Sequence, residues 1–160
     1  QQVINGPNSI TGEWGHNPLP WLSKEDKLTP CYCGKSGCIE TFLSGPGMSK
    51  QYQLLNNALT LSSDEIVKLS RQGEASAKVI MHQYRDQLAR SLASVINILD
   101  PDIIVFGGGL SNIDKLHQQV ATRLPNYVFS DTVNTKLTKA LHGDSSGVRG
   151  AAWLAISDRT

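Results

Sequence analysis

The chain has 160 residues, 15 lysines and arginines against 14 aspartates and glutamates, and a net charge of +1. This length suits one domain or one large lobe, and the near-neutral balance argues against an electrostatic nucleic-acid binder. No apolar run approaches the ~18 residues of a membrane span. Residues 1–7 have no initiator Met and no signal-peptide pattern. With reduced thiols, these features predict a cytoplasmic protein with no membrane partner.

The first third of the chain predicts little regular structure. Residues 1–12 are expected to form a strand and then a turn, because Asn5-Gly6-Pro7-Asn8 is typical turn sequence. Residues 13–47 contain no long periodic run and are rich in Gly, Pro and Cys. We expect them to form an ordered loop.

Two helices are expected next. Ser62 precedes Glu65 by three residues, which is a capping-box pattern and predicts a helix over about 63–71. Apolar residues then recur at three- and four-residue steps, which predicts a long amphipathic helix over about 75–98. Asp100-Pro101 ends this helix, because the residue before a proline avoids the α region.

The last third predicts alternating strands and helices. Residues 103–106 form a short β-branched apolar run, typical of a buried parallel strand. Glycines 107–109 follow, and a helix is expected from Ser111 or Asn112 to Leu124. Residues 128–139 predict a second strand, and residues 147–157 a final helix. This order indicates an α/β fold.

Three cysteines lie within eight positions, at Cys31, Cys33 and Cys38. Secreted disulfide scaffolds use even numbers of cysteines, whereas a tight thiol cluster is typical of a zinc site. Gly34 and Gly37 can adopt the positive φ that wraps a backbone around an ion. A fourth ligand would be a histidine: the nearest is His16, and the others are His82, His117 and His142. The alternative is three unrelated thiols.

Three further patterns are weak on their own. Strand–Gly-Gly-Gly–helix allows a nucleotide to approach the backbone at the end of a strand, but a tight turn without a ligand fits equally well. Glu13 and His16 are three residues apart and share a face if that turn is helical. Glu40 follows Cys38 by two residues and could accept hydrogen bonds from hydroxyl groups. Taken alone, each glutamate is more simply interpreted as a solvated surface charge.

Taken together, these motifs resemble a known family. Glu13-x-x-His16, Cys31-x-Cys33-Gly34-x-x-Gly37-Cys38-x-Glu40 and Ser44-Gly45 closely resemble the signature of the ROK family of sugar kinases and repressors. Residues 104–111 are similar to its C-terminal nucleotide-site segment. Within the family, residues 12–21, 31–35 and 142–152 resemble bacterial fructokinase of the manno(fructo)kinase type.

The resemblance implies an actin-like, ribonuclease-H-like ATPase fold of two α/β lobes, of which residues 1–160 would be the C-terminal lobe. Residues 13–47 would form the sugar and zinc loop, and residues 103–124 the nucleotide side. The final helix over 147–157 would pack towards the N-terminal lobe of the same protein. That lobe would carry the phosphate loop and the general-base aspartate, so no catalytic base is expected in this chain.

The resemblance also implies roles for particular residues. His16, Cys31, Cys33 and Cys38 would bind a structural zinc. Glu13, His16 and Glu40 would bind the sugar, and Gly107, Gly108, Gly109, Ser111 and, more weakly, Pro46 the nucleotide. The expected reaction is Mg²⁺-dependent transfer of phosphate from ATP to a hexose, fructose first and mannose next. A homodimer is expected. The alternative is a sugar-sensing ROK repressor, which would bind nucleic acid.

Overall fold

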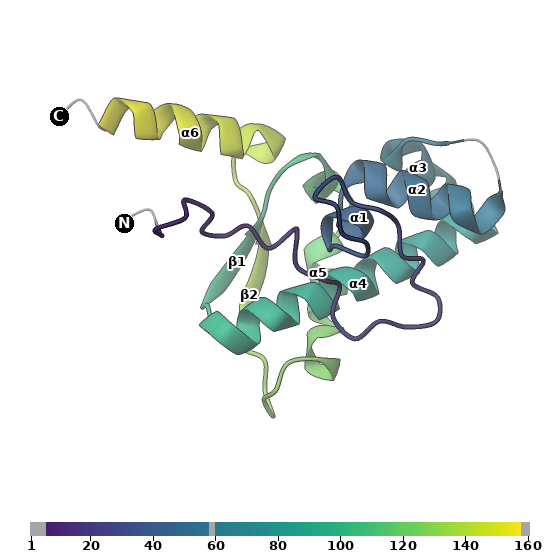
Figure 1. Ribbon diagram of the computed structural model, residues 1–160, viewed down its shortest axis with the longest axis horizontal. Coiled ribbons are helices and arrows are strands. Elements are labelled where there is room, and N and C mark those ends of the chain that lie inside the picture. The colour runs from purple at the N-terminus through teal and green to yellow at the C-terminus, as the bar shows by residue number, and fades with distance from the viewer. Residues whose placement is uncertain (1–5, 58–59, 158–160) are drawn as a thin grey trace.

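A computed structural model describes residues 6–57 and 60–157 (Figure 1). The helices are α1 (Glu40–Leu43), α2 (Gly45–Asn56), α3 (Ser63–Gln72), α4 (Ala75–Leu99), α5 (Leu116–Ala121) and α6 (Ser146–Ser157). The strands are β1 (Ile103–Phe106) and β2 (Lys136–Lys139), and short 3-10 turns span Gly109–Asn112, Leu124–Asn126 and Gly143–Ser145. Residues 1–5 of the predicted N-terminal strand lie outside the described residues, and residues 6–12 form turns.

Helix α4 organises the core, as its apolar periodicity predicts. It runs through the length of the body, with α2 and α3 near one end and the strands near the other (Figure 1). The Glu74 carboxylate caps its start by accepting from the backbone N–H groups of Ser76 and Ala77. Asp100 ends it in the left-handed conformation, directly before Pro101. The buried side chains around it include Met48, Ile66, Ile80, Met81, Leu88, Leu92, Ile96, Leu116, Val120 and Leu124.

The starts of α2 and α3 follow local capping rules. The predicted capping box is confirmed: Glu65 N–H donates to Ser62 Oγ (3.3 Å), and Ser62 N–H donates to Glu65 Oε2 (2.8 Å). Helix α2 was not predicted, although its start carries two recognisable signals. Ser44 Oγ accepts from Gly47 N–H at 3.0 Å, and Pro46 lies in the first turn.

Helices α1 and α2 approach each other closely at Gly47. A Cβ atom there would lie 2.7 Å from Thr41 O and 2.9 Å from Glu40 O. Both are backbone atoms of α1 and cannot rotate away, so Gly47→Ala is expected to destabilise the fold by about 1–3 kcal/mol. Urea denaturation measures this change. Gly147→Ala is the control, because a Cβ at Gly147 meets nothing within 4 Å; equal midpoints for the two variants would contradict the prediction.

The predicted strands are present and pair in parallel, with Ile103 opposite Lys136 and Phe106 opposite Lys139. The second is shorter than expected, because residues 128–135 form bends and irregular structure and only Lys136–Lys139 form the strand. The expectation that β1 is buried holds for one face only. Ile104 and Phe106 pack against the α4 core, whereas Ile103 is 51% and Val105 55% exposed. A continuous apolar run predicts a strand that is covered on both faces. The part of the chain that the structure describes covers only one face of β1.

The expected continuous helix over 111–124 is wrong. The chain forms a 3-10 turn, leaves it at Ile113 in an extended conformation, and enters α5 through Lys115 at φ 53°. This double change of direction lets Ile113, Leu116, Val120 and Leu124 all become buried in the α4 core. The tertiary gain from burial therefore overrides the local helical pattern.

Helix α6 confirms the predicted final helix in position and type. It extends away from the body (Figure 1), and its Val148 side chain is 75% exposed. That it packs towards a second lobe remains a prediction. Among the described residues, none of the helices combines the length and apolarity needed to cross a membrane.

Candidate functional site

The loop that precedes α1 is ordered by backbone hydrogen bonds between its two halves. Leu19 N–H donates to Gly37 O (3.0 Å), Ile39 N–H to Asn17 O (2.9 Å) and Glu40 N–H to Gly15 O (2.9 Å). A small apolar cluster of Leu19, Ile39 and Phe42 lies beneath, and Trp14 joins it to the main core. The predicted ordered loop is therefore confirmed, although its last residues already belong to α1 and α2.

The cysteine segment folds back as a knuckle. Cys31 N–H donates to Lys35 O at 2.7 Å. Gly34 (φ 85°) and Gly37 (φ 75°) have the positive φ that the sequence predicts. A Cβ atom at Gly37 would also lie 2.7 Å from Leu28 Cδ2. Glycine is favoured at Gly37 by its backbone conformation, whereas the exposed Leu28 side chain can move aside for a Cβ atom.

This fold brings His16 together with the three cysteines. The four potential ligand atoms lie within 4.8 Å of one another. His16 Nδ1 is 3.5 Å from Cys31 Sγ, and Cys33 Sγ is 3.6 Å from Cys38 Sγ. Ligands of a tetrahedral zinc are roughly 3.5–3.8 Å apart, given Zn–S near 2.3 Å and Zn–N near 2.0 Å. The donor types and the spacing therefore fit zinc, with no need for His82, His117 or His142.

The thiols of the cluster differ in acidity. A backbone hydrogen bond from Lys35 is the main cause that lowers the pKa of Cys33 to about 7. Burial is the main cause that raises the pKa of Cys38 to about 11. Of these two thiols, the exposed Cys33 is therefore the one that ionises more readily. A bound cation would favour deprotonation of all the thiols.

The second nitrogen of His16 faces away from the cysteines. Nε2 lies 2.7 Å from the Tyr32 hydroxyl and 3.6 Å from Glu40 Oε2. The Glu13 carboxylate is nearby: an ideal Cβ at Gly15 would lie 3.4 Å from Glu13 Oε1 and 3.6 Å from Glu40 Cβ. Residues 13–16 form no helix, so Glu13 and His16 do not share a helical face. The two carboxylates and the imidazole are nevertheless close together.

A buried ion pair anchors the other side of the loop to α4. Arg90 donates to both Asp26 carboxylate oxygens at 3.0 Å, and to Pro20 O (3.0 Å) and Trp21 O (2.7 Å). Its Nε also lies 3.0 Å from Asp86 Oδ2. Sequence reasoning missed this anchor, because Arg90 lies 64 residues from Asp26 and no local pattern connects them.

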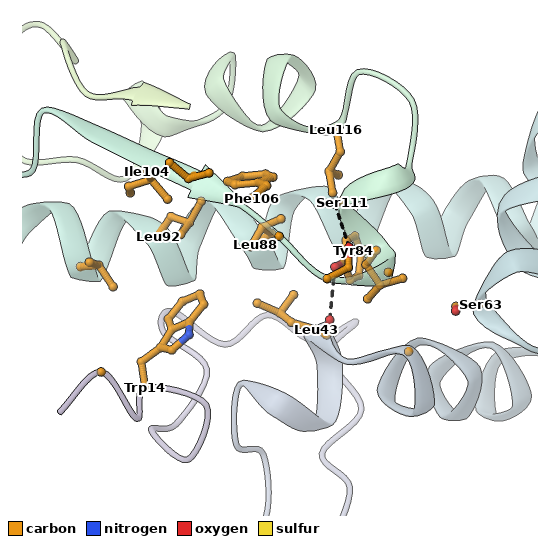
Figure 2. A pocket seen from close by; sticks show the side chains of 18 of the residues that line it. Trp14, Leu43, Ser63, Tyr84, Leu88, Leu92, Ile104, Phe106, Ser111 and Leu116 are labelled. Atoms are coloured by element: carbon orange, nitrogen blue, oxygen red, sulfur yellow. Dashed lines mark hydrogen bonds between the residues drawn. The ribbon is translucent and has the colours of Figure 1, made fainter. Parts of the chain in front are cut away.

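A separate cavity of about 890 Å³ opens at the glycine-rich end of β1 (Figure 2). Gly107, Gly108, Gly109 and Ser111 line one side, and Ser63 and Asp64 line it from the start of α3. Apolar side chains of α4 and β1, together with Trp14, Leu43 and Leu116, form much of the remaining lining (Figure 2). Sequence reasoning missed Ser63 and Asp64. Pro46 lines a different cavity of about 530 Å³, together with Tyr32 and Glu40.

The family model for ROK proteins matches residues 1–158. The chain belongs to the ROK family. An N-acetyl-D-glucosamine kinase of Shigella boydii serotype 4 (strain Sb227) is 40% identical over 160 residues, covering 97% of this chain and 52% of the relative. Fructokinase is not supported by this relationship.

Solved ROK structures share the fold. A glucokinase from Streptomyces griseus, in complex with glucose and AMPPNP, matches with a TM-score of 0.78 and 21% identity, over 96% of this chain and 54% of that one. A ROK transcriptional regulator, a homologue of the E. coli MLC protein, matches with a TM-score of 0.66 and 23% identity, over 86% and 36%. The fold is the α/β C-terminal lobe of ROK kinases. The chain spans about half the length of its curated relatives.

Proposed function

We propose that the protein is an ATP-dependent ROK sugar kinase whose sugar is N-acetylglucosamine, and that this chain supplies the sugar loop and one side of the nucleotide site. The observation that carries the proposal is the arrangement of His16. One ring nitrogen faces the cysteines at 3.5 Å, and the other faces outward, 3.6 Å from the Glu40 carboxylate. The curated relative named above supports the choice of sugar.

The sugar side works by binding and orientation. Zinc held by His16 and the three cysteines has four protein ligands and no open position, so it supplies structure rather than a reactive water. With Nδ1 on the metal, His16 Nε2 carries the proton and donates to a sugar hydroxyl. Glu13 and Glu40 accept from other hydroxyls, each bond worth about 1.5–3 kcal/mol. A sugar without a matching hydroxyl would leave a carboxylate unpaired and be rejected.

The nucleotide side rests on the glycine segment. A Cβ atom at Gly107, Gly108 or Gly109 would meet nothing within 4 Å, and all three line the cavity of about 890 Å³. ATP could therefore approach the backbone closely there, with Ser111 beside it. Pro46 lies in the other cavity, so the nucleotide proposal rests on the glycines and Ser111. The catalytic base and the phosphate loop are proposed to lie outside these 160 residues.

The cavity beside Glu40 supports an N-acetyl sugar. Its volume is about 530 Å³, and Pro30 and Pro46 contribute apolar surface to its lining. An acetyl methyl group is apolar and would bury favourably against such surface, while the sugar hydroxyls face the carboxylates. Fructose and mannose offer no such group. We therefore place N-acetylglucosamine ahead of both.

The test is ADP release by the full-length, zinc-loaded protein with Mg²⁺-ATP and a panel of sugars. The panel contains N-acetylglucosamine, glucose, mannose, fructose and N-acetylmannosamine. The highest kcat/KM is expected with N-acetylglucosamine. A higher value with fructose would restore the substrate expected from sequence. Silence across the panel, from folded protein, would overturn the kinase proposal.

Glu40→Gln separates the sugar role from the metal role. We expect the KM for the sugar to rise about 10- to 100-fold, because a charged acceptor becomes a neutral one, while one zinc per chain is retained. Steady-state kinetics and metal analysis measure the two effects. Glu25→Gln is the matched control, because Glu25 is an exposed carboxylate of the same loop. Loss of zinc from the Glu40 variant would contradict this division of roles.

A sugar-sensing regulator is the second candidate, because a ROK transcriptional regulator shares this fold. Such a protein would bind sugar through the same loop without turnover. Calorimetry on a protein that is silent in the ADP assay would detect it. The 40% identity to a kinase favours the first proposal.

A further inference from the structure

Tyr32 occupies an unusual position in the cysteine knuckle. It lies between Cys31 and Cys33, and its side chain is 83% exposed. Its ring meets the His16 imidazole edge to face, with centroids 4.8 Å apart and planes at 86°. The hydroxyl lies 2.7 Å from His16 Nε2, a short hydrogen bond. Because the ring is exposed, packing in the core does not explain why its hydroxyl lies on this nitrogen.

The bond to Tyr32 uses the nitrogen that a ligand needs. His16 has two ring nitrogens, and Nδ1 faces Cys31 Sγ at 3.5 Å. Nε2 is therefore the one left for a sugar hydroxyl, and it carries a single N–H. In this structure the Tyr32 hydroxyl takes that place, with Glu40 Oε2 at 3.6 Å from the same nitrogen. A sugar hydroxyl and the Tyr32 hydroxyl would compete for one donor.

We propose that Tyr32 is a latch that closes the sugar site by occupying His16 Nε2, and that it must swing out before a sugar can bind. This inference rests on the sugar-binding role of the loop proposed above. Tyr32 and Glu40 line the same cavity of about 530 Å³, so outward rotation of the ring widens the space beside the carboxylate. The exposed ring can rotate without disturbing the buried core.

The latch makes sugar binding weaker than the open site would allow. The apparent Kd of a site that must first open is the intrinsic Kd divided by the fraction of molecules that are open. The closed state gains one hydrogen bond between the hydroxyl and Nε2, so its removal is expected to tighten sugar binding about two- to tenfold. Tyr32 is a positioning residue in this scheme, because it acts through His16 and leaves before the sugar arrives.

Tyr32→Phe tests the latch, since it removes the hydroxyl and keeps the ring. Calorimetric titration of the full-length, zinc-loaded protein with N-acetylglucosamine should show Kd falling about two- to tenfold. In steady-state kinetics, KM should fall by a similar factor. The kcat should stay within about twofold, with zinc content unchanged. The His16 Nε2–H proton NMR signal should be protected in the sugar-free wild type, exposed in sugar-free Tyr32→Phe, and protected in both with sugar. Lys35→Ala, an exposed change in the same knuckle, should leave Kd unchanged.

The outcomes distinguish a failure of the latch proposal from a failure of the proposed sugar-binding function. Equal or weaker sugar binding by Tyr32→Phe, beside a wild type that binds sugar, overturns the latch alone. A folded, zinc-loaded wild type that binds none of the panel sugars overturns both the proposed function and the latch. A tighter Kd that Lys35→Ala reproduces also overturns the latch, because loosening of the knuckle would then explain it.

Discussion

Cys38→Ala is expected to remove the zinc and unfold the loop over residues 13–39. Cys38 is 1% exposed, and its Sγ lies 3.6 Å from that of Cys33. A structural zinc site contributes apparent binding energy of about 10–16 kcal/mol in small peptides. The loop here has only a small apolar cluster of its own. Loss of one ligand should therefore melt the loop before the α4 core.

Metal analysis and hydrogen exchange measure this result. Zinc per chain should fall from one to near zero, and exchange should accelerate over residues 13–39 but remain slow in α4. Treatment of the wild type with a chelator should produce the same pattern, which separates metal loss from the small cavity that alanine leaves. Ser36→Ala, an exposed change in the knuckle, is the control. Full zinc retention by the Cys38 variant would refute the ligand assignment.

Arg90→Met is expected to destabilise the fold by about 3–5 kcal/mol, because it leaves the Asp26 carboxylate buried and unpaired. The side chains of Arg90 and Asp26 are 3% and 2% exposed and meet at 3.0 Å. Only the uncharged donors Gln87 Nε2 and Ser23 N–H, among the described residues, would still donate to Asp26. The loop would also lose the hydrogen bonds to Pro20 O and Trp21 O.

Denaturant unfolding measures this loss, with Arg71→Met as an exposed control on α3. The double variant Asp26→Leu/Arg90→Met should recover most of the stability, because an apolar pair removes the unpaired charge. A loss from Arg90→Met no greater than from Arg71→Met would show that the ion pair contributes little to stability.

The same pair predicts a dependence on pH. Burial by itself raises the pKa of Asp26, but hydrogen bonds from Arg90, Ser23 and Gln87 outweigh it and hold that pKa below its usual value. A lowered folded-state pKa stabilises the protein above the unfolded value of about 3.9. This stability is lost as the pH falls through the folded pKa. The difference in unfolding free energy between wild type and Arg90→Met should therefore shrink below about pH 4.

Features encoded within a few residues could be read from the sequence. The Ser62–Glu65 capping box, the period of α4 and its end at Asp100-Pro101 depend on neighbouring backbone groups, and all were confirmed. The three clustered cysteines predicted a metal knuckle, and the positive φ of Gly34 and Gly37 followed the prediction. The resemblance carried by these motifs identified the family. It pointed to fructose as the sugar, which the 40% identity to an N-acetyl-D-glucosamine kinase does not support.

Features that depend on partners far apart in the sequence appeared only in the fold. Asp26 meets Arg90 across 64 residues, and Tyr32 meets His16 across 16. The break at Ile113 arose because four apolar side chains had to reach one core, which local propensity does not encode. The sequence by itself thus determined the local turns, caps and metal-binding residue types. The tertiary structure decided which side chains meet, because burial and hydrogen-bond geometry are set by packing between distant segments.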